Sequence, residues 1–189
     1  MGSMAIYIAL LRGINVGGKN MIKMAELKRT FETMGLGRVR TYIQSGNVLF
    51  ESEEEEEPLR ERIEQEIAAA QGLSVSVVLR TAEEVRRIAA SCPFSEAALE
   101  KAEESAEGES LYVGFLLREP SREGMERLAP YKNEDEQYHI AGREIFLLFS
   151  RSVRNSKLSA NLQKLDVPVT VRNWNTLNKL VALANEMEA

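Results

Sequence analysis

The segment Leu-Leu-Arg-Gly-Ile-Asn-Val-Gly-Gly-Lys-Asn, residues 10–20, has residue types that could bind phosphate. Gly13, Gly18 and Lys19 follow the spacing of a P-loop, but Asn20 stands where that motif has the serine or threonine that holds magnesium. Glycines allow a backbone to approach an anion closely, and a lysine supplies positive charge. The segment is therefore a candidate anion-binding loop.

The surrounding pattern argues against nucleotide hydrolysis at this loop. P-loop enzymes need a parallel sheet and a second strand that ends in a metal-binding acid. Here the helix expected after the loop leads into a hairpin, and no apolar strand ends in Asp. A plain strand-to-helix connection could also use Gly13, Gly17 and Gly18 for their positive φ angles, so a loop without a ligand remains an alternative.

The elements expected around this loop bring a second loop next to it. Residues 5–11 form an apolar strand, residues 24–34 show helical spacing, and two strands at 38–44 and 47–51 flank the turn Ser45-Gly46. In this arrangement the glycine-rich loop and the hairpin turn lie at the same end of the sheet. The expected ligand-binding residues at this end are Arg12, Asn15, Gly17, Gly18, Lys19, Asn20, Ser45, Gly46 and Asn47.

The order β-α-β-β-α-β occurs twice along the chain, which predicts a duplicated fold. The strand at 111–116 parallels the first strand, and a second hairpin, helix and strand follow it. We expect an α+β protein made of two tandem ferredoxin-like β-α-β-β-α-β units, each followed by an extra helix. The expected domains are residues 4–92, an Ala/Glu-rich helical linker at 93–110, and residues 111–189, with the two halves packed as one body.

The second half offers another cationic corner. Residues 150–159 and 171–177 follow its third and fourth strands, so Lys157 and Arg172 could converge there with Asn173 and Trp174 as further ligand-binding residues. Simpler roles compete with this interpretation. Asn173 has the residue type of a helix N-cap, and Trp174 that of a packing anchor. Arg172 is harder to explain, because it ends an apolar strand where an unpaired charge is costly.

Bulk composition limits the classes of partner and compartment. A formal net charge of -5 does not favour diffuse binding to nucleic acid, although a local basic patch could override the average. The single cysteine, Cys92, excludes an intramolecular disulfide and fits a reducing cytoplasm. The apolar runs are too short to span a bilayer, so no membrane partner is expected. No motif indicates a cofactor or metal, and the acidic run 53–57 lacks the pattern of a calcium loop.

Several stretches together resemble a known family: YIALLRGINVGGKN, MAELKRTFETMG, VRTYIQSGNVLF, NSKLS and VTVRNWNTLNKL. They are similar, in order and over nearly the whole chain, to the bacterial domain-of-unknown-function family numbered 1697. The resemblance implies a duplicated ferredoxin-like fold and no established activity. The family pattern usually has proline and glycine before Ser156-Lys157-Leu158, and this chain departs from it there.

Three functions follow from these patterns. The first is a cytoplasmic, non-enzymatic protein that binds a small phosphate- or carboxylate-bearing ligand at the glycine-rich loop and hairpin turn. The second is single-stranded RNA binding, suggested by fold and by the strands around Tyr7 and Tyr112; burial of both rings would argue against it. The third is an enzyme acting on a phosphorylated substrate, for which the lone His139 and Cys92 give no convincing catalytic group.

Overall fold

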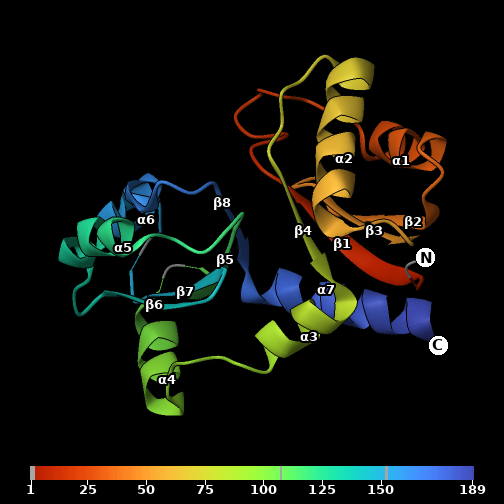
Figure 1. The fold of residues 1–189 in the computed structure, drawn as a ribbon. Coiled ribbons are helices and arrows are strands. Elements are labelled where there is room, and N and C mark those ends of the chain that lie inside the picture. The colour runs from red at the N-terminus through yellow and green to blue at the C-terminus, as the bar shows by residue number, and fades with distance from the viewer. Residues whose placement is uncertain (1–2, 107, 152) are drawn as a thin grey trace. The chain divides into compact units, whose positions relative to one another are not determined.

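The computed structural model describes residues 3–106, 108–151 and 153–189 (Figure 1). The described residues form two four-stranded antiparallel sheets and seven α-helices, so the protein belongs to the mixed α and β class. The chain divides into two compact units. The first comprises the residues up to Ala90 together with Asn178–Ala189, and the second comprises Ser91–Leu177. The sequence-based division differs at the end of the chain, since it assigned the closing helix to the second half.

The first unit follows the expected element order. Its elements are β1 (Ala5–Leu11), α1 (Met24–Thr33), β2 (Gly37–Tyr42), β3 (Asn47–Ser52), α2 (Glu56–Gln71), β4 (Val77–Thr81) and α3 (Ala82–Ala89). The strands lie in the order β2-β3-β1-β4, and every neighbouring pair is antiparallel. The end of β1 therefore lies between the β2–β3 turn and the start of β4.

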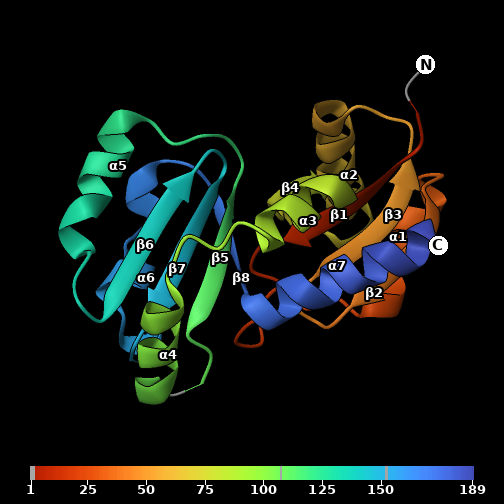
Figure 2. The ribbon, with the colours of Figure 1, turned by 90° about the horizontal axis from the view of Figure 1, so that it is seen from below.

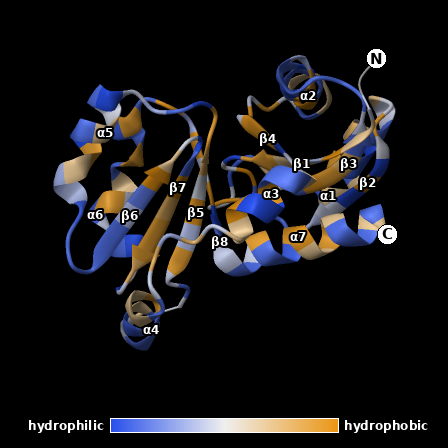
Figure 3. Cartoon of the chain, turned by 60° about the horizontal axis from the view of Figure 1, so that its bottom comes forward, coloured by the Kyte–Doolittle hydropathy of each residue, from blue (hydrophilic) through white to orange (hydrophobic). Residues whose placement is uncertain are grey.

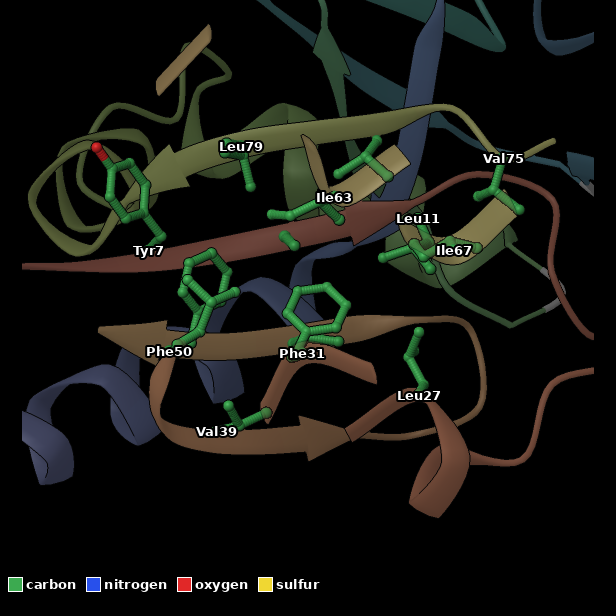
Figure 4. Close-up of a cluster of buried hydrophobic side chains, with 14 of the residues drawn as sticks. Tyr7, Leu11, Leu27, Phe31, Val39, Phe50, Ile63, Ile67, Val75 and Leu79 are labelled. Carbon is green, nitrogen blue, oxygen red and sulfur yellow. The ribbon is translucent and has the colours of Figure 1, made fainter. Parts of the chain in front are cut away.

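One face of this sheet packs against α1 and α2. Figure 4 shows Phe31 from α1 and Ile63 from α2 directed toward Tyr7 and Phe50 of the sheet. The rings of Phe31 and Phe50 have centroids 5.5 Å apart, and both side chains are fully buried. Phe31 belongs to the helical spacing that predicted α1, and Tyr7 belongs to the apolar run that predicted β1.

The opposite face of the sheet is covered by α3 and α7 (Trp174–Glu188), as Figure 1 shows. The part of α7 that belongs to the first unit buries the apolar side chains of Leu180, Leu183, Ala184 and Met187. Glu186 of α7 pairs with Arg40 of β2 at 2.9 Å, and Glu188 pairs with Arg86 of α3 at 3.0 Å. This second helical layer explains why the sequence of β1 is apolar at every position.

The second unit has its own sheet and helices. Its elements are α4 (Glu96–Ser105), β5 (Leu111–Leu116), α5 (Arg122–Leu128), β6 (Glu136–Ala141), β7 (Glu144–Phe149), α6 (Lys157–Ala160) and β8 (Val169–Asn173). The strand order is β6-β7-β5-β8, again antiparallel throughout. Figure 2 shows the sheet with α5 and α6 beside it, and Figure 3 shows that β7 is mostly hydrophobic whereas the edge strand β6 is mostly hydrophilic.

The helix expected after the second hairpin, which contains Leu158, Leu162 and Leu165, is only partly α-helical. Its α-helical part ends at Ala160, and a 3-10 turn follows from Leu162 to Leu165. All three leucines are nevertheless buried in the core of the second unit. Apolar spacing thus located the buried face correctly but did not distinguish the two kinds of helix.

Within the described residues, no helix is long and apolar enough to cross a membrane.

The packing of α7 on the first sheet leads to a stability prediction. Met187 is 2 % exposed, so Met187→Ala should leave a cavity and lower the unfolding free energy of the first unit by about 2–5 kcal/mol. Lys179→Ala, which shortens an exposed side chain of the same helix, should change it by less than about 0.5 kcal/mol. Hydrogen exchange of the amides of β1 and β3 measures both values. Equal protection in the two variants would contradict this role of α7.

Candidate functional site

The glycine-rich loop and the hairpin turn lie side by side at one end of the first sheet. The amide of Leu11 donates to the carbonyl of Gly46 at 2.9 Å, and the amide of Arg12 donates to the carbonyl of Ser76 at 3.0 Å. The loop therefore leaves β1 between the β2–β3 turn and the segment that leads into β4. This neighbourhood is the one expected from the order of the elements.

The side chain of Asn15 ties this loop to the turn. Its Nδ2 donates to the carbonyl of Gln44 at 2.8 Å and to that of Ile22 at 3.0 Å, while its Oδ1 accepts from the amide of Ile22 at 2.8 Å. One amide group thus satisfies backbone groups of two separate loops. Asn15 has a φ of 54°, in the left-handed region that asparagine tolerates better than most residues.

The middle of the loop forms a miniature hairpin rather than a phosphate cradle. The amide of Lys19 donates to the carbonyl of Val16 at 3.0 Å around Gly17 and Gly18, whose φ angles are 58° and 75°. Two consecutive positive φ values are typical of the tightest hairpin turn, for which glycine is preferred. The Nδ2 of Asn20 also donates to the carbonyl of residue 13 at 3.0 Å. This geometry and the antiparallel sheet both differ from a P-loop.

Gly46 is the point of closest approach between turn and loop. A Cβ atom on Gly46 would lie 2.7 Å from Cδ1 of Ile14 and 2.9 Å from Cβ of Leu11, and its φ is 93°. Any larger residue would clash with two buried side chains and strain the backbone. A glycine is therefore required here to keep the two loops in contact.

Three exposed cations stand at this end of the sheet: Arg12, Lys19 and Lys23. None of them forms an ion pair with another described residue. The loops that meet here, residues 12–23, 42–46 and 72–76, contain no Asp or Glu. We call this region, with its three cations and the loops 12–23 and 42–46, the cationic end.

Glu64 and Glu26 lie near these loops but form no ion pair with the three cations. Glu64 of α2 accepts from the amide of Val77 at 2.8 Å and from Arg60 at 2.9 Å, so its charge is already matched. Glu26 in the first turn of α1 is exposed. The run of glutamates at 53–57 follows β3 and lies at the other end of the sheet, because Ser52 pairs with Ala5 at the start of β1. The first unit thus separates its charges along the strands.

The polar residues that we expected to bind a ligand at this end of the sheet divide into two groups. Arg12 and Lys19 are exposed at the cationic end, as a ligand would require. The amide side chains of Asn15 and Asn20 are used within the loop. Asn47 is fully buried, and its Nδ2 donates to the carbonyl of Tyr42 at 2.9 Å and to Oγ of Ser45 at 3.0 Å. Asn47 therefore shapes the turn and does not face a ligand, contrary to expectation.

The sequence patterns missed four residues at the cationic end. Lys23 precedes α1 and adds a third cation, which its position between Ile22 and Met24 did not reveal. Three large apolar side chains are also exposed here: Val16 at 64 %, Met21 at 65 % and Ile43 at 46 %. We call these three residues the apolar rim. Sequence alone gave no signal for their exposure, because apolar residues in a folded domain are expected to be buried.

The second corner does not assemble as predicted. Lys157 is exposed at the start of α6, on the side of the second sheet where Val169 and Val171 meet the helices. Arg172 alternates with these valines along β8 and therefore points to the opposite face. The two cations are not brought together, so they do not form one anion site.

Arg172 is buried and bonded within its own strand. Its Nη1 donates to the carbonyl of Val171 at 3.0 Å, and loss of water around the guanidinium lowers the pKa of Arg172 to about 10. Arg80 is also buried, on β4 of the first unit, and its Nη1 donates to the carbonyl of Leu79 at 3.0 Å. Both arginines are parts of the folded interior rather than of an open site.

Asn173 and Trp174 have the simpler of their two possible roles. The Oδ1 of Asn173 accepts from the amide of Thr176 at 2.8 Å and so caps the start of α7. The ring of Trp174 packs against Phe146, with centroids 6.2 Å apart. Both residues therefore have structural partners that account for their residue types.

A broad hollow of about 1040 Å³ lies in the second unit, between the end of β7 and the segment that precedes β6. Lys157 lines it together with Arg151, but Glu134, Asp135 and Glu136 line it as well. Arg151 pairs with Asp135 at 3.1 Å. The hollow is therefore lined by charges of both signs, unlike the cationic end.

Comparison with known proteins adds a family. Residues 4–146 match the family described as "Protein of unknown function (DUF1697)". The chain belongs to the DUF1697 family. A solved structure of another protein, conserved bacterial protein SP0830 from Streptococcus pneumoniae, is similar at 26 % identity and a TM-score of 0.66, covering 96 % of this chain and 99 % of that one. No match was found among curated proteins.

Family membership confirms the resemblance seen in the sequence and leaves the activity open. The matched region of this DUF1697 protein contains the whole cationic end, whereas Lys157 and Arg172 lie beyond it.

The tight contact at Gly46 predicts a large effect of a small substitution. Gly46→Ala should lower the unfolding free energy of the first unit by about 2–4 kcal/mol, through overpacking and strain at positive φ. Gly35→Ala is the control in the same unit, because its φ is 83° but nothing lies within 4 Å of the added atom. It should cost about 1 kcal/mol. Similar losses for both variants, measured by hydrogen exchange of β3, would show that Gly46 has no special contact.

Proposed function

We propose that this DUF1697 protein binds a small anion, bearing phosphate or carboxylate groups, at the cationic end. The observation that carries the proposal is the set of three exposed cations without an ion pair among the described residues, in loops that hold no carboxylate. The chain as a whole has a formal charge of -5, so this local excess is not an average property of the surface. Charges of one sign gathered at one place attract counter-ions and charged ligands.

The rigidity of the loop supports ligand binding. The side chain of Asn15 hydrogen-bonds the hairpin turn, and that of Asn20 hydrogen-bonds the start of the loop. Gly46 packs against the base of the loop. A site whose geometry exists before the ligand arrives loses less conformational entropy on binding. The exposed glycines at 17 and 18 leave backbone accessible beside Lys19.

The composition of the cationic end favours binding over catalysis. Residues 12–23 and 42–46 contain no His, Cys, Asp or Glu that could transfer a proton near neutral pH. The single histidine, His139, belongs to β6 of the second unit. An enzyme that used these cations to hold its substrate would need a base from elsewhere.

Burial of the tyrosines weighs against RNA binding on the sheet. Tyr7 is buried, its hydroxyl donates to the carbonyl of Glu54 at 2.7 Å, and desolvation with nearby Glu55 raises its pKa. Tyr112 packs edge-on against Phe149, with centroids 5.7 Å apart, on the helix-covered side of its sheet. Tyr7 is buried and Tyr112 is half-buried, whereas this mode of binding requires open rings for base stacking.

We also infer that the two units are copies of one ferredoxin-like unit. The strand orders β2-β3-β1-β4 and β6-β7-β5-β8 support this inference, since each places the first strand of its unit between the third and the fourth. The pairs Ile8 with Arg80 and Val113 with Arg172 occupy matching register positions. A shared strand order with a buried arginine at the same place is simplest to explain by duplication.

Titration with inorganic pyrophosphate tests the proposed function. Arg12→Ala, Lys19→Ala and Lys23→Ala should each weaken binding by about three- to tenfold, because each removes one charged partner of the anion. Lys101→Ala removes an exposed lysine of the second unit and should leave the affinity unchanged. Isothermal titration calorimetry at low salt measures the dissociation constants.

Two results would refute the proposal. One is the absence of pyrophosphate binding at millimolar concentration. The other is binding that Lys101→Ala weakens as much as the three variants of the cationic end, which would indicate non-specific attraction.

A further inference from the structure

The apolar rim is the feature that anion binding alone does not explain. Val16, Met21 and Ile43 are three of the five large apolar side chains that are strongly exposed among the described residues. They belong to the same two loops that form the cationic end. A small hydrophilic anion gains nothing from apolar side chains that project into water, so these residues point to a larger, partly apolar ligand.

The three side chains of the apolar rim come from one small area. The side chain of Asn15 hydrogen-bonds the carbonyls of Ile22 and Gln44. Each residue of the apolar rim is a direct chain neighbour of Asn15 or of one of these two partners. The rim is therefore held together by the same bonds that fix the loop.

The backbone conformation of Ile43 is energetically unfavourable for its residue type. Its φ is 48°, in the left-handed region where a β-branched residue is strongly disfavoured, and its side chain is nearly half exposed. Gly or Asn would suit this backbone better and would expose no apolar surface. Strained and exposed apolar residues of this kind are found where a functional contact compensates for them.

We propose that the cationic end docks on the surface of an anionic lipid bilayer. The proposal builds on the proposed function and names its ligand: the lipid head-group phosphates bind Arg12, Lys19 and Lys23, while the apolar rim enters the boundary between head groups and acyl chains. Exposed apolar side chains flanked by lysine and arginine are the combination that binds such interfaces. This contact is peripheral, so it needs no membrane-spanning helix, and it differs from the expectation drawn from the short apolar runs.

A bilayer fits this surface better than an acidic protein segment does. The apolar rim projects from separate points of two loops. Two of its side chains lie on either side of the turn at Gly17 and Gly18, and the third comes from the hairpin turn. A protein partner would have to supply a matching pocket for each side chain, whereas fluid lipids rearrange around them. The acidic run 53–57 at the opposite end of the sheet strengthens the argument. A negative surface attracts one end of the first unit and repels the other, which orients it with the cationic end toward the lipid.

Sedimentation of the full chain with vesicles tests this inference. The protein should bind vesicles of phosphatidylcholine mixed with phosphatidylglycerol and should not bind vesicles of phosphatidylcholine alone. The variant Val16→Ser/Met21→Ser/Ile43→Asn should bind the anionic vesicles at least about tenfold more weakly while retaining its affinity for pyrophosphate. Ile43→Asn alone should weaken vesicle binding without destabilising the fold, since asparagine suits the positive φ.

A fluorescent probe tests insertion directly. In the Met21→Trp variant, anionic vesicles should shift the emission of the new tryptophan to shorter wavelength, as its ring leaves water. A Lys101→Trp variant carries the probe on α4 instead. It should show no shift beyond the one that Trp174 gives in the protein without an added tryptophan.

The outcomes separate the two proposals. Pyrophosphate binding without vesicle binding would overturn the bilayer inference and leave the proposed function intact. Vesicle binding that the triple apolar variant does not weaken would also overturn it, because attraction of charges alone would then suffice. Binding of polyglutamate in place of vesicles would identify an acidic protein segment as the partner and overturn it as well. Absence of both pyrophosphate and vesicle binding would refute both proposals.

Discussion

The amide side chain of Asn15 is the contact on which the candidate site depends. Through three hydrogen bonds to backbone groups, it closes the glycine-rich loop at Ile22 and joins it to the hairpin turn at Gln44. Polar backbone groups in such loops must be satisfied, and a carboxamide can serve a donor and two acceptors at once. Gly46 completes the contact by leaving room for the base of the loop. These two residues hold the loop that contains Arg12 and Lys19 against the turn.

Charges of opposite sign are separated along the first sheet, and the two joined loops lie at its positive end. The loops 12–23 and 42–46 at one end contain cations and no carboxylates, whereas the loop at the other end contains five consecutive glutamates, 53–57. Part of the acidic end is matched locally, since Arg62 pairs with Glu54 at 2.5 Å. The cations at the cationic end have no such matching among the described residues. We propose that this end of a protein with a net charge of -5 attracts anions, and that its apolar rim contacts a larger partner.

Much of the fold could be predicted from the sequence, because periodicity reports which side chains are buried. The strand at 5–11 and the helix expected at 24–34 are found at these places. Periodicity does not say what a buried face packs against, so the closing helix was assigned to the wrong unit. In the site, the order of elements predicted that the two loops meet. It could not show that Asn47 turns inward, since an amide can bind a ligand or its own backbone equally well, nor that Val16, Met21 and Ile43 stay exposed.

The most direct test of the account is to observe where an anion binds. Amide chemical shifts of the full protein, followed by NMR while inorganic phosphate is added at low salt, report on every loop at once. The account predicts saturable changes confined to residues 12–23 and 42–46, with the strand amides of both sheets unaffected. Changes centred on the hollow around Lys157, or changes spread evenly over exposed lysines and arginines, would contradict it.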